Sequence, residues 1–487
     1  MMTSNGTVPA LDAILTAHAT GGPDRLALID RSDRWTYRRA DRAVGTIAAR
    51  LRSIGLAPGT VVGLQMPNTA ASVVVLLAVM RAGMIPAPLP LLWRRKDCVA
   101  ALSEAGARAI VTCGRVGDFD HAALALEVAA ELFPIRAVCG IGCAAMEGII
   151  PLDELLNDAD NRAETLRVQD AGPASPALVT FETTADGIVP IARDATQLIA
   201  GGRLVRQRAE IGSGAVILTS ISSTSYAGVS AALVPWLLGG GTLVLHDSFH
   251  PETLREQIDK EQCDVLVVPN GLLPGLAASD WLDPPGIRSV VAIWRSPERF
   301  ASAAQWTNLD VALIDVAAFG ESGLLAARRS PGGRTSPWPI GKVRIADTGS
   351  TCAEVAVTPG GTLGLSGLLA ASPYRPYGTG DKTDDSSPAD RHVDTGYPCR
   401  ITPDQQGLVV TAPPAGLVAV GGYRFPIHDL QRLIRDIDRH GVLAALPHAV
   451  TGHRLAGHAS DLVTMRGALQ NMSVNPLVTA AFGRRSA

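Results

Sequence analysis

Hydrophobic and polar residues alternate with two different periods along residues 35–112. Apolar side chains recur at helical spacing in RADRAVGTIAARLRSIG, residues 39–55, where Gly55 is a suitable C-cap. After it the pattern predicts a short strand at 60–67 and an apolar helix at 70–82. A proline-rich turn follows, and then a helix at 96–105 and a strand at 107–113. This order predicts an α/β unit with a largely parallel sheet.

The same alternation returns in residues 176–320, which contain a helix after Asp194. The expected strands lie at 177–181, 215–220 and 264–269. Residues 229–245, VSAALVPWLLGGGTLVL, form a long apolar run whose triple glycine and β-branched end favour a buried helix-to-strand unit. The apolar run at 71–80 is too short for a bilayer, so no membrane span is expected.

From about residue 330 the pattern changes to short strands and turns, and a last unit begins near residue 412. We therefore predict a large N-terminal domain over residues 1–411 and a short C-terminal domain over residues 412–487. The N-terminal domain is expected to contain two α/β subdomains and one β-rich subdomain, at about 1–175, 176–325 and 326–411.

Composition narrows the possible functions. The 487 residues are 47% hydrophobic and 18% charged, which fits a globular protein. The net charge of -3 gives no basic surface for nucleic acid, so small molecules or proteins are the expected partners. The 7 cysteines contain no CxxC pair, which predicts no metal site and favours a reducing, cytoplasmic compartment.

Residues 34–89 resemble the opening of the adenylate-forming superfamily, which contains acyl-CoA synthetases, aryl-CoA ligases and the adenylation domains of peptide synthetases. The similarity continues in order and spacing to about residue 435. The segments that carry it are Trp35-Thr36-Tyr37, the Gly59 turn, Pro67-Asn68, Ala82-Gly83, LVPWLLGGGTLVL, FGESG and GGYRFPIHDL.

The resemblance implies an α/β fold, with two α/β subdomains and a small β subdomain followed by a mobile α+β C-terminal domain, which is shortened in this chain. It also implies a chemistry. Enzymes of this family join a carboxylate to ATP with Mg²⁺, release pyrophosphate, and pass the acyl-adenylate to the thiol of CoA or of a carrier protein. Such chemistry depends on positioning and charge neutralisation, so individual side chains decide whether it is retained.

The family's phosphate loop corresponds to TFETTADGIVPIA, residues 180–192. The hydroxyl groups and turn glycine that the resemblance assigns to nucleotide binding are those of Thr183, Thr184 and Gly187. However, Val-Pro-Ile replaces the usual Pro-Lys-Gly, and Glu182 and Asp186 place carboxylates beside the expected phosphates. Each such like-charge contact costs about 1–4 kcal/mol. The other interpretation is an ordinary turn leading to a helix capped by Asp194.

The family's aromatic-Gly-x-Thr-Glu motif is also altered. Phe319 and Gly320 correspond to its nucleotide-binding aromatic and glycine residues. Ser322 can replace the threonine, and Glu321 lies two residues before the usual glutamate. Glu321 and Ser322 are therefore the candidate catalytic residues, with Glu321 the candidate for contact with Mg²⁺.

The aspartate that binds the ribose in the family has two candidate positions. Tyr397 stands in the expected context, after Thr395-Gly396, but replaces the carboxylate with a phenol. Asp381 belongs to an intact Thr-Gly-Asp sequence, which lies inside the polar stretch 372–394. Spacing favours Tyr397, and both interpretations stay open.

The resemblance places the ligand pocket near Ser225, Tyr226 and Gly228, with Ser225 where a histidine is common. Tyr226 is more typical of packing than of ligand contact. Trp294 and Arg295 replace a glycine pair near the adenine, so we expect them to crowd that part of the pocket.

The C-terminal domain has lost its charged motifs. The hinge corresponds to APPAGLVAVGG, residues 412–422, which carries no charge and is stiffened by Pro413 and Pro414. No lysine follows Lys382, so the family's C-terminal catalytic lysine has no counterpart. Gly421-Gly422-Tyr423 do keep the loop that serves the thiol in the family.

Several charge-bearing groups are therefore lost together, and each such group typically contributes about 10²- to 10³-fold to the rate. We predict a protein that cannot run ordinary ATP-dependent activation and needs no cofactor. It is expected to bind a small carboxylic acid or acyl ligand, or a protein such as a carrier protein or a paralogous ligase. The alternative is an active acyl- or aryl-CoA ligase that uses ATP, forming an AMP intermediate, with Mg²⁺ and CoA.

Overall fold

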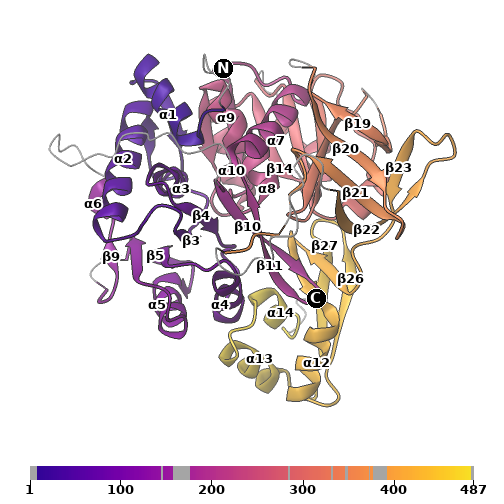
Figure 1. The fold of residues 1–487 in the computed structure, drawn as a ribbon. Coiled ribbons are helices and arrows are strands. Elements are labelled where there is room, and N and C mark those ends of the chain that lie inside the picture. The colour runs from indigo at the N-terminus through magenta and orange to yellow at the C-terminus, as the bar shows by residue number, and fades with distance from the viewer. Residues whose placement is uncertain are drawn as a thin grey trace.

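The computed structural model describes residues 8–143, 146–156, 176–282, 286–330, 333–345, 349–371, 373–376 and 392–483. Two α/β sheets, a β-rich subdomain and a small C-terminal domain follow one another along the chain (Figure 1). The predicted α/β fold with a large N-terminal and a small α+β C-terminal domain is thereby confirmed. Within the described residues, no helix combines the length and the apolar character needed to cross a membrane.

The first α/β sheet is parallel throughout, as the alternating pattern predicts. Its strands, in spatial order, are β4 (Ile85–Pro88), β3 (Val61–Gln65), β5 (Ala109–Cys113), β8 (Ala137–Ile141) and β9 (Ile150–Pro151). The helices of this region are α1 (Leu11–Gly21), α2 (Tyr37–Ser53), α3 (Ala70–Arg81), α4 (Arg95–Glu104), α5 (His121–Glu131) and α6 (Asp153–Leu156). Two very short strands, β6 (Arg115–Val116) and β7 (Phe119–Asp120), pair beside them. The helix expected at 70–82 is α3, whose side chains are mostly buried because it is apolar around its circumference.

The second α/β sheet has 8 strands and positions the candidate site. Its order is β17 (Gly323–Arg328), β16 (Ala312–Phe319), β15 (Ser289–Trp294), β14 (Val265–Pro269), β12 (Val216–Thr219), β13 (Thr242–Leu245), β1 (Leu26–Ile29) and β2 (Arg34–Thr36). The six strands from β16 to β1 are parallel, and β17 and β2 are antiparallel edges. β1 pairs with β13, so the start of the chain completes the second sheet although it precedes the first in sequence.

Helices of the second unit include the long apolar run at 229–245. They are α7 (Ala195–Arg208), α8 (Tyr226–Gly228), a π-helical turn (Val229–Leu233), α9 (Val234–Gly239), α10 (Pro251–Glu261) and α11 (Leu273–Ala277), with short 3-10 turns at Asn270–Leu272, Asp280–Leu282 and Pro297–Ser302. Gly240 ends α9 in the left-handed conformation with φ 62°, and the chain then enters β13. The run is therefore a buried helix-to-strand unit, as its glycines predict. Asp194 caps α7, also as predicted, by accepting the Gln197 backbone N–H at 2.8 Å.

The β-rich subdomain is an antiparallel sheet of 6 strands, in the order β18 (Trp338–Pro339), β23 (Gly407–Val410), β22 (Val393–Ile401), β21 (Thr362–Gly367), β20 (Thr351–Val357) and β19 (Gly341–Arg344). One continuous hydrophobic core joins it to both α/β sheets. The domain boundaries given above stay predictions, but the shared core makes these units one packed body.

The C-terminal domain has its own core, which includes Phe425, Ile434 and Phe482. Its sheet runs β25 (Tyr423–Pro426), β24 (Leu417–Val420), β27 (Gly452–His458) and β26 (Val442–His448), with helices α12 (Ile427–Ile437), α13 (Leu462–Asn471) and α14 (Pro476–Ala480). A separate hairpin, β10 (Leu178–Thr184) with β11 (Gly187–Arg193), extends from the N-terminal domain toward this small domain (Figure 1). β10 contacts β25, so the hairpin is one of the places where the two domains meet.

Candidate functional site

A cavity of about 390 Å³ lies between the N-terminal and C-terminal domains. Four of its lining residues, Ser220, Asn270, Arg295 and Gly320, directly follow β12, β14, β15 and β16. Since these strands are parallel, their carboxyl ends meet at one edge of the sheet, where α/β proteins place their ligand sites. Position and volume both make this cavity the candidate functional site.

The C-terminal domain forms the opposite wall of this interdomain cavity. It contributes the turn and first residues of the β24–β25 hairpin and the turn between β26 and β27, namely Gly421, Gly422, Tyr423, Arg424, Val450, Thr451 and Gly452. The Tyr423 phenol accepts the Leu92 N–H at 3.4 Å, and Arg299 donates to the His448 carbonyl at 2.7 Å and to the Gly452 carbonyl. The turn that resembles the thiol-serving loop therefore borders the cavity itself.

Residues 180–192 form a closed hairpin. The β10–β11 ladder runs without a break from Leu178 opposite Arg193 to Thr184 opposite Gly187, which leaves only residues 185 and 186 as the turn. The Thr184 hydroxyl donates to the Gly187 carbonyl at 3.0 Å and accepts the Asp186 N–H at 3.2 Å. Backbone and hydroxyl groups that a phosphate loop would offer to a ligand are thus used within the hairpin itself.

The side chains of this hairpin divide between two places. Thr183 lines the cavity, whereas Thr184 does not line it and Gly187 is exposed at the tip. Glu182 also lines the cavity, and its carboxylate is nearly buried, at 10% exposure. Of the three residues predicted to bind nucleotide in this segment, only Thr183 therefore reaches the candidate site.

Arg424 joins Glu182 to Tyr397. Its guanidinium forms an ion pair with the Glu182 carboxylate and donates to the Tyr397 hydroxyl. Burial lowers the pKa of Arg424, but Glu182 and Tyr397 outweigh that effect and raise it above its ordinary range. Burial also raises the pKa of Tyr397, whose ring is 1% exposed and packs edge-on against Phe319 at 5.6 Å. A cation of the C-terminal domain thus occupies the space between the phosphate-loop and ribose positions.

Glu321 lies at the edge of the same cavity but its carboxylate is already engaged. It accepts the Tyr226 N–H at 2.7 Å, and its own N–H donates to Glu182. Burial raises the pKa of Glu321, and the positive charge of Arg193 opposes that shift. The Arg193 guanidinium lies 3.7 Å from the centre of the Tyr226 ring and donates to the Glu321 carbonyl.

A model of the family described as AMP-binding enzyme matches residues 15–297, more than half of the chain. The chain belongs to the AMP-binding enzyme family. The chain is 25% identical over 483 residues to 2-hydroxy-7-methoxy-5-methyl-1-naphthoate–CoA ligase of Streptomyces carzinostaticus, covering 92% of this chain and 84% of that protein. It is 33% identical over 167 residues to a salicylyl-CoA synthase / salicylate adenylyltransferase of a Streptomyces species, covering 33% of this chain and 30% of the relative.

Solved structures agree on the fold of this chain. The amide bond synthetase McbA of Marinactinospora thermotolerans superposes with a TM-score of 0.73 and 17% identity, over 96% of this chain and 94% of that one. Apo MbtA of Mycobacterium smegmatis gives a TM-score of 0.63 and 20% identity, over 99% and 90% of the two chains.

Family members use Mg²⁺, an ion that proteins usually hold through one or two carboxylates together with substrate phosphates and water. Hard divalent cations require several oxygen ligands around one point. No group of three or more His, Cys, Asp or Glu side chains in the described residues could hold a metal ion. Glu321 is committed to a backbone N–H, and Ser322, whose own N–H donates to the Phe319 carbonyl at 3.2 Å, does not line the cavity.

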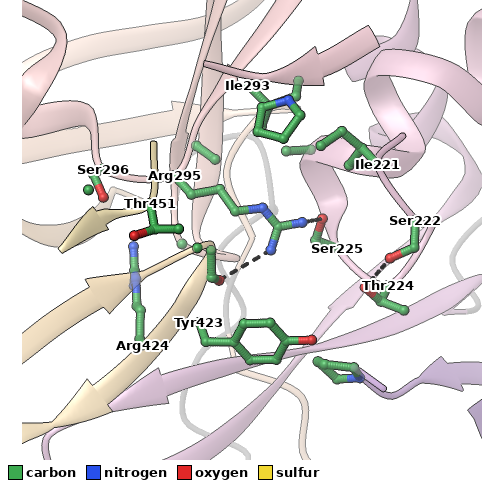
Figure 2. A pocket seen from close by; sticks show the side chains of 18 of the residues that line it. Ile221, Ser222, Thr224, Ser225, Ile293, Arg295, Ser296, Tyr423, Arg424 and Thr451 are labelled. Atoms are coloured by element: carbon green, nitrogen blue, oxygen red, sulfur yellow. Dashed lines mark hydrogen bonds between the residues drawn. The ribbon is translucent and has the colours of Figure 1, made fainter. Parts of the chain in front are cut away.

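Not all of the ligand-pocket residues predicted from the sequence line the cavity. Trp294 points away from the cavity, because its indole N–H donates to buried Asp315 at 2.8 Å, and Asp315 pairs with Arg329. Arg295 is the residue that enters the cavity, where it donates to the Ser225 hydroxyl at 2.7 Å and to the Gly422 carbonyl at 3.4 Å (Figure 2).

The rest of the predicted set lies at or behind the same wall. Ser225 lines the cavity, whereas Tyr226 and Gly228 are buried behind it in α8 and do not line it. Gly320 lines the cavity, and Phe319 is fully buried beside it. Asp381 lies outside the described residues, so the second ribose candidate stays a prediction.

Sequence reasoning missed Arg424, the residue that connects this site. Arg424 is the first charged residue after the uncharged segment 412–422. Its position in the sequence does not show whether the side chain is buried or which residue it pairs with. Its partner, Glu182, had been identified only as an obstacle to phosphate.

Proposed function

We propose that this AMP-binding family member binds a small organic acid or acyl ligand in the interdomain cavity and does not activate it with ATP. The observation that carries the proposal is the closed β10–β11 hairpin, whose Glu182 side chain forms an ion pair with Arg424 on the side of the cavity. The fold and its ligand-sized cavity are kept, and the parts that handle a triphosphate are used for internal contacts.

Opening the hairpin for a triphosphate would break ladder hydrogen bonds and the Thr184 contacts that close its turn. Arg424 does not compensate for the missing lysine, because its charge is already matched by Glu182. Asp186, exposed at the hairpin tip, is a carboxylate without such a cation in the sequence nearby, and it would repel a polyanion that came into contact with it by about 1–4 kcal/mol.

The alternative is an active aryl- or acyl-CoA ligase, and one observation favours it. Over 92% of the chain the protein is similar to a relative named as a CoA ligase. In that case ATP and Mg²⁺ would be cofactors, and CoA or a carrier protein would receive the acyl group. For a binding protein, a carrier protein or a paralogous ligase remains the candidate macromolecular partner.

ATP–pyrophosphate exchange separates the two functions. The full-length protein is assayed with Mg²⁺ against benzoate, salicylate, naphthoate and short fatty acids, with a salicyl-AMP ligase such as the Mycobacterium tuberculosis relative as positive control. We expect no exchange and no calorimetric heat from ATP with Mg²⁺. Exchange that Glu321→Ala abolishes would overturn the proposal in favour of the ligase.

A further inference from the structure

Arg295 is a cation that the fold directs into the cavity, with no ion-pair partner among the described residues. It follows β15 directly, at the carboxyl edge of the parallel sheet, and its side chain extends across the cavity toward the C-terminal domain (Figure 2). Its two hydrogen bonds go to neutral oxygens, the Ser225 hydroxyl and the Gly422 carbonyl. Among the described residues, Arg295 forms no ion pair within 4.0 Å.

The other charges of the cavity wall are matched or engaged. The charged lining residues are Glu182, Arg295, Arg299, Glu321 and Arg424. Glu182 and Arg424 neutralise each other, and the Glu321 carboxylate accepts the Tyr226 N–H. Arg299 donates to the His448 and Gly452 carbonyls, which hold it against the C-terminal domain. The wall therefore carries three cations and two carboxylates, and Arg295 is the cation that extends across the cavity, whereas Arg424 pairs with Glu182 and Arg299 lies against the turn between β26 and β27.

Arg295 has hydrogen-bonding capacity left for that ligand. A guanidinium carries five N–H donors in a planar fork, and it binds carboxylate and phosphate groups through two parallel hydrogen bonds. Two of its contacts are accounted for within the described residues. The remaining donors face a space bordered by apolar Ile221, Ile293 and Pro269, and by the hydroxyl of Thr224.

We infer that Arg295 is the anion-binding residue of the cavity and that the ligand is a small organic oxyanion with an apolar body. This inference rests on the proposed binding function and gives its ligand a chemical class. A cavity of about 390 Å³ accommodates a molecule of the size of a substituted aromatic acid. The oxyanion is a carboxylate or a phosphate, since a guanidinium fork binds either group in the same way.

Isothermal titration of the full-length protein, without ATP, tests the assignment. Three probes of similar size are used: benzoate, phenyl phosphate and the neutral isostere benzamide. We expect benzoate or phenyl phosphate to bind at least tenfold more tightly than benzamide, and their ratio identifies the oxyanion. Arg295→Gln should remove this preference, and Arg295→Lys should keep part of it. The matched control is Arg288→Gln, just before β15, whose side chain is 83% exposed and which should bind all three probes as the wild type does.

The inference is overturned if benzamide binds as tightly as both anions, if Arg295→Gln keeps the preference, or if none of the three probes binds. Should Arg295→Gln fail to fold, the Arg295→Lys variant carries the test, because it retains charge but lacks the planar fork. Its affinity for the anions should fall at least threefold, and an unchanged affinity counts against the assignment. Pyrophosphate exchange would disprove the proposed function, but it would not change the affinities measured for Arg295 and its variants. The failure of one proposal can therefore be told apart from the failure of the other.

Discussion

Arg424 of the C-terminal domain and Glu182 of the β10–β11 hairpin form an ion pair across the domain boundary, with side chains only 11% and 10% exposed. Arg424 also donates to the Tyr397 hydroxyl, and Glu182 accepts the Glu321 N–H. One buried pair therefore connects the hairpin, the β-rich subdomain and the C-terminal domain. The same contact that fills the nucleotide side of the site also holds the small domain in place.

Removal of one member of this pair should loosen the C-terminal domain. Arg424→Leu leaves the Glu182 carboxylate buried without its cation, and breaking a buried pair in this way costs about 3–5 kcal/mol. We expect a lower urea midpoint and faster proteolysis between the two domains. Removing both charges, in Glu182→Gln/Arg424→Leu, should recover much of the loss.

The matched control for that variant is the exposed pair Arg432–Asp429, whose side chains are 76% and 55% exposed. Arg432→Gln should change stability by less than about 1 kcal/mol, because solvent screens such pairs. Equal effects of Arg424→Leu and Arg432→Gln would mean that the buried pair does not hold the domains together.

Glu298 should make the protein less stable as the pH rises. Both of its carboxylate oxygens are buried without a hydrogen-bond partner in the described structure. Burial raises its pKa above the ordinary value of 4.5, although the backbone of Glu298 itself and the charges of Arg424 and Arg299 partly oppose the shift. As the pH rises from that value, the unfolded chain ionises this group before the folded protein does. The unfolded state therefore gains relative stability until the folded pKa is passed.

Glu298→Gln removes this penalty and should raise the melting temperature at neutral pH. The difference from the wild type should shrink as the pH falls to 4.5 and below, where the wild-type carboxyl becomes protonated in both states. Glu147→Gln, in an exposed turn, serves as the control and should show no such pH-dependent difference. A gap between wild type and Glu298→Gln that is constant from pH 4 to pH 8 would contradict the prediction.

Gly187 should be required for the closed hairpin. Its φ of 135° lies in a region that side chains other than glycine rarely adopt, while no atom within 4 Å would touch an added Cβ. Gly187→Ala should therefore cost about 1–3 kcal/mol through backbone strain alone, seen as faster hydrogen exchange in β10 and β11. Gly212→Ala is the control, since that site has the same free space and no positive φ, and its effect should stay below about 0.5 kcal/mol.

Much of the fold followed from local pattern. The α3 and α7 helices, the parallel strands and the buried run at 229–245 were predicted because periodicity, caps and glycines are properties of neighbouring residues. The pairing of β1 with β13 was not predicted, since it joins residues about 215 positions apart, and no local signal shows which sheet an edge strand will join.

The site was predicted less completely, for a physical reason. Of the residues selected by their spacing along the chain, Thr183, Ser225, Gly320 and Glu321 line one cavity. Spacing could not show which way a side chain turns at the end of a strand, so Trp294 and Arg295 were both expected in the pocket, and only Arg295 lines it. Nor could it pair Glu182 with Arg424, whose contact exists only when the two domains are docked.

Restoring the family's carboxylate at the ribose position should not restore nucleotide binding. In Tyr397→Asp the new side chain would still face Arg424, and the hairpin would still be closed over the phosphate position. We expect no calorimetric heat on titration with ATP and Mg²⁺. The variant should also lose about 3–5 kcal/mol of folding stability, as other large-to-small core changes do, because a fully buried aromatic ring is removed. Tyr397→Phe is the control that keeps the ring and removes only the hydroxyl contact with Arg424. Micromolar ATP binding by Tyr397→Asp would mean that the missing carboxylate, and not the closed hairpin, keeps nucleotide out.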